Sequence, residues 1–239
     1  MVEPGESMAC GGYRIAWSNP EPRQVPGKAS LIVESPDGVR VLEVLREAWS
    51  PQTIAPLWCE PVLDTDDAVL GYTLFGGGAD CCWEGRIVRL GQPARELLKV
   101  NLGHYATLEP RQLDGEGPLE LVAKSDLFAS FADLPEAFTP YLPLVFAYNG
   151  DVYVEATRRF DAHLETELKA RIDALRTKSF YENAGDALGI FGTSALLGQE
   201  GSAFDELQGR VSPEVVRWLE KNSARALAKI DRRYNTRPR

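Results

Sequence analysis

The chain has 239 residues, of which 44% are hydrophobic and 26% are charged, and its formal net charge is −9. This apolar content is enough for a folded core and argues against a disordered chain. The acidic balance argues against nucleic acid as a partner, since phosphate binding needs clustered Lys and Arg side chains. No apolar run approaches the roughly 20 residues that a membrane-spanning helix requires, so we expect no transmembrane segment.

The first residues, Met1 to Glu6, have neither a basic start nor an apolar stretch. No signal peptide is therefore visible in the sequence. Two interpretations follow: the protein is cytoplasmic, or the sequence is a mature exported form with an added Met.

Residues 1–155 are predicted to form an antiparallel, β-rich domain. Short runs of Leu and β-branched residues alternate with Pro, Gly, Asn and Asp, which is the pattern of strands and turns. The regular spacing favours a sandwich-like or propeller-like sheet, and no interleaved helical pattern supports a βαβ fold. The expected strands are Arg14–Ser18, Ala29–Glu34, Val39–Arg46, Ile54–Cys59, Val69–Phe75, Arg86–Leu90, Leu97–Leu102, Leu119–Lys124, Pro143–Tyr148 and Val152–Ala156.

Residues 156–239 are predicted to form a helical unit that packs on the β-rich domain, so the expected fold class is α+β. The charge changes at this boundary, since residues 1–155 hold 11 Lys and Arg against 23 Asp and Glu, and residues 156–239 hold 15 against 12. Apolar residues between Phe160 and Leu175 recur at helical spacing. Ser212 and Pro213 then have the typical order of an N-cap and a first helical residue.

A second helix is predicted from its end signals. Ser179 and Glu182 fit a capping box at its start, and Gly198 is expected just after its end. Three further glycines share one face of this helix, although each weakens a helix by about 1 kcal/mol relative to Ala. A close backbone contact on that face is the natural reason for Gly185, Gly189 and Gly192.

The four cysteines, Cys10, Cys59, Cys81 and Cys82, all lie in the predicted β-rich domain. Adjacent cysteines in a strand point to opposite faces, which disfavours a shared metal ion. We expect two bridges that join Cys10 and Cys59 to Cys81 and Cys82, and these imply an oxidising compartment. A bond between the two adjacent cysteines is a rarer arrangement, and four reduced thiols would instead indicate a cytoplasmic protein.

An acidic stretch has the outline of a calcium-binding loop. Such loops place oxygen ligands at alternate positions and use Gly for the sharp turn. Gln112, Asp114, Glu116 and Glu120 occupy the positions of side-chain ligands. The alternative is an acidic turn that leads into the strand Leu119–Lys124, in which case no cofactor is expected.

The same stretch resembles a family signature. Residues 114–121, Asp-Gly-Glu-Gly-Pro-Leu-Glu-Leu, look like the Asp-Gly-Asp-Gly-x-x-Glu-Leu loop of FG-GAP-like β-propeller proteins. Residues 77–82, Gly-Gly-Ala-Asp-Cys-Cys, resemble a Gly-Gly-Ala-His-Cys-Cys motif of a group of uncharacterised bacterial exported proteins, with Asp80 in place of His. The resemblance spans residues 69–160. It implies an extracytoplasmic location and a binding or structural role, and it implies no catalytic residues.

The predicted function is therefore non-enzymatic. We expect an extracytoplasmic protein, periplasmic or secreted, that binds a protein or an envelope polysaccharide or supports the envelope. No nucleophile elbow, phosphate loop, dinucleotide fingerprint or zinc-protease motif is present in the sequence. Two alternatives remain open: a hydrolase that acts on an envelope polymer through paired carboxylates, and a cytoplasmic acidic inhibitor or immunity protein that masks a basic partner.

Overall fold

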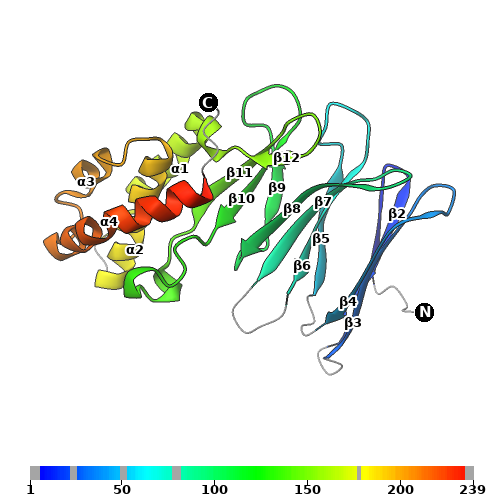
Figure 1. Cartoon of the computed structure of the whole chain (residues 1–239), viewed down its shortest axis with the longest axis horizontal. Helices are drawn as coiled ribbons and strands as arrows, with labels where there is room; N and C mark the ends of the chain where they lie inside the picture. The colour runs from blue at the N-terminus through cyan, green and yellow to red at the C-terminus, as the bar shows by residue number, and fades with distance from the viewer. Residues whose placement is uncertain (1–5, 22–25, 49–52, 77–81, 177–178, 235–239) are drawn as a thin grey trace. The chain divides into compact units, whose positions relative to one another are not determined.

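A computed structural model describes residues 6–21, 26–48, 53–76, 82–176 and 179–234 of the chain. In these residues the N-terminal part is β-rich and the C-terminal part is helical (Figure 1). This confirms the mixed fold class that the sequence predicts. Among the described helices, none combines the length and the apolar sequence that a membrane-spanning helix needs.

The described strands form three antiparallel sheets of four strands each. The first has the order β1-β2-β3-β4, the second β5-β6-β7-β8 and the third β12-β11-β10-β9. Each predicted strand coincides with an observed one, whereas β1 and β9 are not predicted from the sequence. The bounds are β1 Glu6–Cys10, β2 Tyr13–Ser18, β3 Gly27–Glu34, β4 Arg40–Ala48, β5 Ile54–Glu60, β6 Val69–Phe75, β7 Trp83–Arg89, β8 Arg95–Gly103, β9 Leu108–Arg111, β10 Glu120–Ser125, β11 Leu142–Tyr148 and β12 Tyr153–Glu155.

The chain divides into two compact units. The first comprises Met1–Ala123 and Ala147–Val154, and the second comprises Lys124–Phe146 and Glu155–Arg239. The segment Lys124–Phe146 thus belongs to the unit that contains the helices, although the sequence suggests a single boundary after residue 155.

The core of the first unit lies between its first two sheets. Alternate residues of β2 and β3 meet alternate residues of β6 and β7, as the two-residue period of a strand requires. Asn19 also connects the two sheets, because its side chain exchanges two hydrogen bonds of 2.8 Å with the backbone of Ile54. The buried cluster includes Ile15, Leu31 and Val33 from the first sheet and Leu70, Tyr72 and Val88 from the second.

A disulfide joins Cys10 in β1 to Cys59 in β5, with the two Cα atoms 5.8 Å apart. The predicted pairing of these two residues with Cys81 and Cys82 is therefore wrong. Strands β1 and β5 are the first edges of their respective sheets, and the contact of the two sheets brings these edges together. Cys82 also takes part in a disulfide bond, while Cys81 lies outside the described residues.

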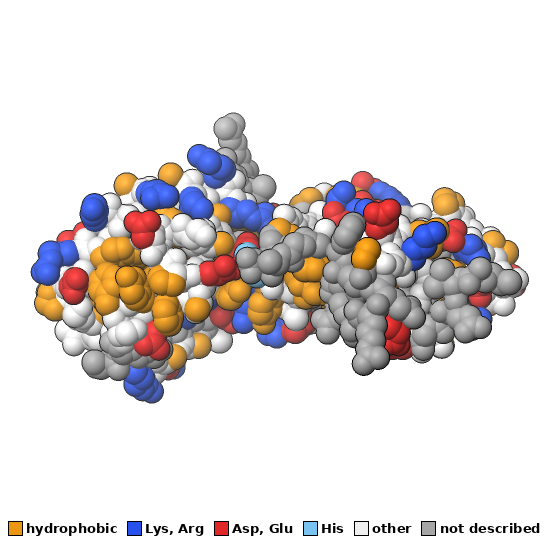
Figure 2. Space-filling view, turned by 90° about the horizontal axis from the view of Figure 1, so that it is seen from below, with side chains coloured by type: hydrophobic (Ala, Val, Ile, Leu, Met, Phe, Trp, Pro, Cys, Tyr) orange, Lys and Arg blue, Asp and Glu red, His pale blue; other side chains and the backbone are white. Residues whose placement is uncertain are grey.

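The second unit contains helices α1 Asp161–Ala174, α2 Phe180–Leu196, α3 Ser202–Leu207 and α4 Pro213–Arg233. The predicted capping box at the start of α2 is confirmed. The Ser179 side chain accepts a hydrogen bond from the backbone N–H of Glu182, and the Glu182 side chain accepts one from the backbone N–H of Ser179. Gly198 follows this helix with a φ of +73°, the left-handed conformation that suits Gly. Ser212 caps α4 and Pro213 is its first residue, as predicted. Hydrophobic side chains gather on the surface of this unit (Figure 2).

The glycines of α2 permit close packing within the second unit. A Cβ atom on Gly185 would lie 2.0 Å from the carbonyl oxygen of Phe138. A Cβ atom on Gly192 would lie 2.8 Å from a methyl carbon of Leu142, and one on Gly189 would lie 2.7 Å from the guanidinium of Arg171. The predicted close backbone contact is thus confirmed at Gly185, whereas Gly189 and Gly192 leave room for neighbouring side chains.

Candidate functional site

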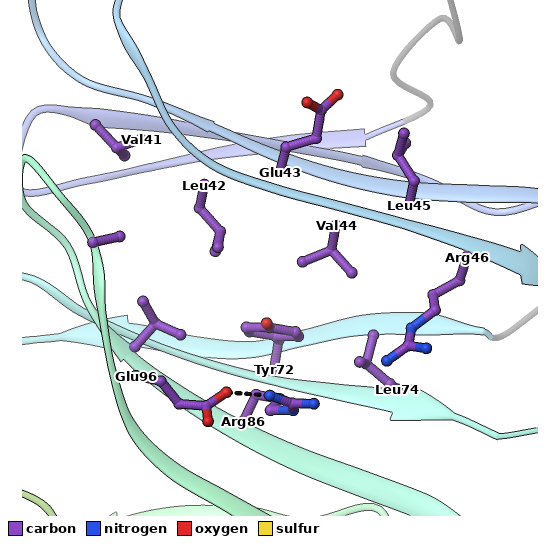
Figure 3. Close-up of a pocket in the computed structure, with 12 residues that line it drawn as sticks. Val41, Leu42, Glu43, Val44, Leu45, Arg46, Tyr72, Leu74, Arg86 and Glu96 are labelled. Carbon is purple, nitrogen blue, oxygen red and sulfur yellow. Dashed lines mark hydrogen bonds and ion pairs between the residues drawn. The ribbon is translucent and has the colours of Figure 1, made fainter.

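The candidate site is a groove of about 430 Å³ in the first unit. It lies between β4 of the first sheet and strands β6, β7 and β8 of the second sheet (Figure 3). A concave site of this volume is within the range of ligand pockets, and its lining combines apolar with charged side chains. Its lining residues are Val41, Leu42, Glu43, Val44, Leu45, Arg46, Tyr72, Leu74, Arg86, Val88, Ala94 and Glu96.

Strand register explains the wall that β4 provides. Leu42 and Val44 stand opposite Val33 and Leu31 of β3, and both of these β3 residues are fully buried in the core. Residues directly opposite in an antiparallel pair share one face, so Leu42 and Val44 also face inward. Figure 3 shows both side chains pointing from β4 toward the second sheet. They remain only half-buried, because they face the groove rather than the packed core.

The opposite wall carries a charged group among apolar neighbours. Arg86 in β7 forms salt bridges with Glu96 in β8 and with Glu84, two residues before it, at 2.7 Å. Lys99 contacts the other oxygen of Glu84 at 3.4 Å. Two carboxylates therefore hold the guanidinium in place, and its position at the groove is defined by its partners.

The ion pairs shift the pKa of Glu84. Burial raises this pKa, but the hydrogen bond and charge of Arg86, with a further contribution from Lys99, outweigh burial and hold it below its ordinary value. Burial lowers the pKa of the Arg86 guanidinium, but the hydrogen bonds and charges of Glu84 and Glu96 outweigh burial and raise this pKa above its ordinary value. Glu84 is therefore an anion and Arg86 a cation at neutral pH.

Tyr72 belongs to β6 in the second sheet and lines the groove (Figure 3). Burial is the main reason that its pKa is raised above the ordinary value of 10.0. The hydroxyl is therefore neutral at physiological pH and can donate a hydrogen bond to a ligand. Together with Arg86 and Glu96, it gives the groove donors and acceptors beside apolar surface.

This arrangement is suited to binding. The residues that line the groove in the described part of the chain include no His, Cys, Ser or Thr. A carboxylate whose pKa is lowered, as in Glu84, is a poor general acid, since that role requires a raised pKa. The groove therefore has the chemistry to hold an amphiphilic ligand by apolar contact and charged hydrogen bonds.

The predicted calcium residues lie together in one loop between β9 and β10. The amide of Gln112 contacts the backbone of Gly115 and Gly117, at 3.1 and 3.2 Å. Asp114 accepts a hydrogen bond of 3.4 Å from the backbone of Glu116, and Glu120, only 3% exposed, accepts one of 2.9 Å from Leu113.

Three of these four side chains thus bind backbone of their own loop. Within the described residues no group of three or more His, Cys, Asp or Glu side chains is arranged around a common metal position. Calcium at this loop stays a prediction.

Sequence reasoning did not identify the groove. Its charged residues, Arg86 and Glu96, come from two strands, and Tyr72 comes from a third. The sequence contains one usable signal for the groove: Arg86 lies between Glu84 and Val88 in a strand whose alternate residues are expected to be buried. This charged residue indicates a site only once its neighbouring strands are known.

Comparison with known proteins supplies no family for this chain. No protein-family model matches it, and neither a curated protein sequence nor a solved structure matches it.

Proposed function

We propose that the protein is an extracytoplasmic, non-enzymatic binding protein whose ligand site is the groove of the first unit. The observation that carries this proposal is the combination of half-buried apolar side chains with the Arg86–Glu96 pair in one concave site. Apolar contact supplies affinity in such sites, and a few placed polar groups supply orientation. The ligand is a protein segment or an envelope polysaccharide.

The extracytoplasmic location is supported by the Cys10–Cys59 bridge. Structural disulfides persist in oxidising compartments and are rare in the cytosol. The bridge also favours this proposal over a cytoplasmic inhibitor or immunity protein, which would keep its thiols reduced.

The sheet organisation supports the finer fold proposal. The first two sheets face each other as the layers of a sandwich do. In addition, three successive four-stranded antiparallel sheets follow the order of propeller blades. We propose a sandwich-like packing built from blade-like sheets, with calcium at the loop of Asp114 as an optional structural ion.

A hydrolase is the less favoured alternative. Glu96 lines the groove, and it shares its ion-pair partner, Arg86, with Glu84. Their shared partner favours a binding role, because a general acid and a nucleophile must differ in protonation.

A groove-blocking variant tests the proposal. Ala94→Phe places a ring in the groove, whereas Val39→Phe adds the same ring at an exposed position outside the lining. Wild type and both variants are passed over a glycan array and a phage-displayed peptide library. The proposal expects ligands that wild type and Val39→Phe retain and Ala94→Phe loses. If neither collection contains a ligand that depends on Ala94, the groove is not the binding site.

A further inference from the structure

Strand β4 is the open edge of the first sheet. It pairs with β3, and no other strand of the described residues pairs with its far side. The strand is nine residues long, and the side chain of Leu45 on it is 62% exposed. Long edges with exposed apolar residues are usually blocked in monomeric proteins, because their free backbone N–H and C=O groups recruit another strand.

The same strand forms one wall of the groove. Leu42, Val44 and Arg46 face inward, since they pair with the buried β3 residues Val33, Leu31 and Ala29. Val41, Glu43 and Leu45 occupy the alternate row. A strand added beside β4 would therefore place every second side chain over the groove, next to Tyr72 and Arg86.

We propose that β4 and the groove together form one site for an extended polypeptide segment of a partner protein, which adds as a fifth strand to the first sheet. This inference rests on the proposed function and names its ligand class. Backbone pairing with β4 supplies part of the affinity, and apolar side chains that enter the groove supply specificity, as in other strand-addition complexes.

The charged residues of β4 predict which charged residues the added strand carries. Arg46 faces the groove and has no acidic partner among the described residues, whereas Glu43 contacts Arg40 in an exposed pair. The residue opposite Arg46 is therefore acidic and the residue opposite Glu43 is basic, three positions away. The residues opposite Leu42, Val44 and Leu45 are apolar.

A second copy of the chain fits this edge poorly. A symmetric antiparallel pair centred on Glu43 would set that carboxylate against itself and Arg40 against Arg46. Centring the pair on Val44 would set Leu42 against Arg46, and centring it on Leu42 would set Val41 against Glu43. Like charges or a charge opposite an apolar residue destabilise a pair, so the complementary strand is a different sequence.

The test uses fluorescent peptide libraries whose members carry an acidic and a basic residue three positions apart among random apolar residues. A second library carries Lys at both positions. Full-length protein is titrated with selected peptides and followed by fluorescence anisotropy. Wild type prefers the mixed-charge peptides, and Arg46→Glu shifts the preference about 3- to 10-fold toward the Lys-Lys peptides. Because Arg46 is exposed, this variant keeps its fold, which circular dichroism checks.

Backbone pairing is tested separately on the selected peptide. N-methylation of one alternate set of its residues removes the N–H groups that face β4 and lowers affinity at least about 10-fold. N-methylation of the other set leaves affinity within about 3-fold. Equal sensitivity of both sets overturns the inference, and so does a protein dimer that Leu45→Arg dissociates. If no peptide binds but a glycan depends on Ala94, the inference fails while the proposed function stands; if neither binds, both fail.

Discussion

Arg86 and Glu96 form a salt bridge across neighbouring strands at the wall of the groove. Glu84 binds the same guanidinium and also contacts Lys99, so two cations and two carboxylates form one cluster. The side chain of Arg86 is 16% exposed, which makes this group less screened by water than a surface pair. The groove therefore has a fixed charged centre whose loss should be measurable.

Removing that centre should change the acid dependence of stability. The pKa of Glu84 lies below its ordinary value of 4.5, so its ion pair stabilises the folded state above that pH and loses this effect as pH falls through the lowered pKa. Arg86→Met should cost about 1–3 kcal/mol at neutral pH, because it removes the ion-pair partner of Glu96 and leaves Glu84 with Lys99. The difference from wild type should shrink below about pH 4.5.

Urea denaturation at a series of pH values measures this effect. Arg111→Met is the control, since the pair of Arg111 with Glu109 is about half exposed on both sides. It should change stability by less than about 0.5 kcal/mol. A constant difference between wild type and Arg86→Met across the acid range would contradict the assigned ion pairs.

A methyl group on α2 should disrupt the second unit. Gly185→Ala places a Cβ 2.0 Å from the carbonyl oxygen of Phe138, so one of the two backbones must move. We expect a loss of about 2–3 kcal/mol, although Ala is the better helix former. Gly201→Ala is the control, because a Cβ there meets no atom within 4 Å. Thermal denaturation compares the two, and equal midpoints would contradict the close contact.

The hydroxyl of Tyr234 should stabilise the second unit. This residue is 1% exposed and donates a 2.9 Å hydrogen bond to the carbonyl of Pro143. Tyr234→Phe should cost about 1–2 kcal/mol by leaving that carbonyl unpaired, whereas Tyr181→Phe at a 48% exposed position should change little.

The same residue predicts an alkaline effect. Burial is the main reason that the pKa of Tyr234 is raised above 10.0, so the folded state favours the neutral phenol. Stability should therefore decline as pH rises above 10.0, and Tyr234→Phe should make that decline smaller. Denaturation between neutral pH and about pH 11 measures it; identical slopes would contradict the assignment.

The disulfide pairing can be read by peptide mapping. Trypsin leaves Cys59 and Cys82 in one peptide, residues 47–86, so a second cleavage at Asp64, Asp66 or Asp67 is needed to separate them. The peptide of Cys10 should then be linked to that of Cys59 and released by reductant. A link from Cys10 to the peptide of Cys82 would restore the pairing that the sequence suggested.

Loss of this bridge should also lower stability. Cys10→Ser and Cys59→Ser should each cost about 2–4 kcal/mol, and the double variant should cost no more than either single one. Additive losses, measured by urea denaturation, would indicate that the two residues act separately.

Features governed by neighbouring residues could be predicted from the sequence. Ser179 and Glu182 are three positions apart, and the capping box depends on that spacing alone. The face of α2 that carries Gly185 follows from helical periodicity in the same way. Strand β9 could not be predicted because it is four residues long and contains Pro110.

Features that depend on distant residues could not be predicted. Cys10 and Cys59 are 49 positions apart and meet because two sheet edges come together. The groove likewise joins Tyr72, Arg86 and Glu96 through strand register, which no short motif encodes. The adjacency of Cys81 and Cys82 suggested bridges to the other two cysteines, but sheet packing determines which partners meet.

The most direct measurement of the central claim is a backbone NMR titration of the full-length protein with a ligand whose binding Ala94→Phe abolishes. The account predicts the largest amide shifts along β4 and at Tyr72, Arg86 and Glu96, with smaller changes in α2 and α4. Shifts concentrated in the helices, or at the acidic loop around Asp114, would contradict the assignment of the groove as the binding site.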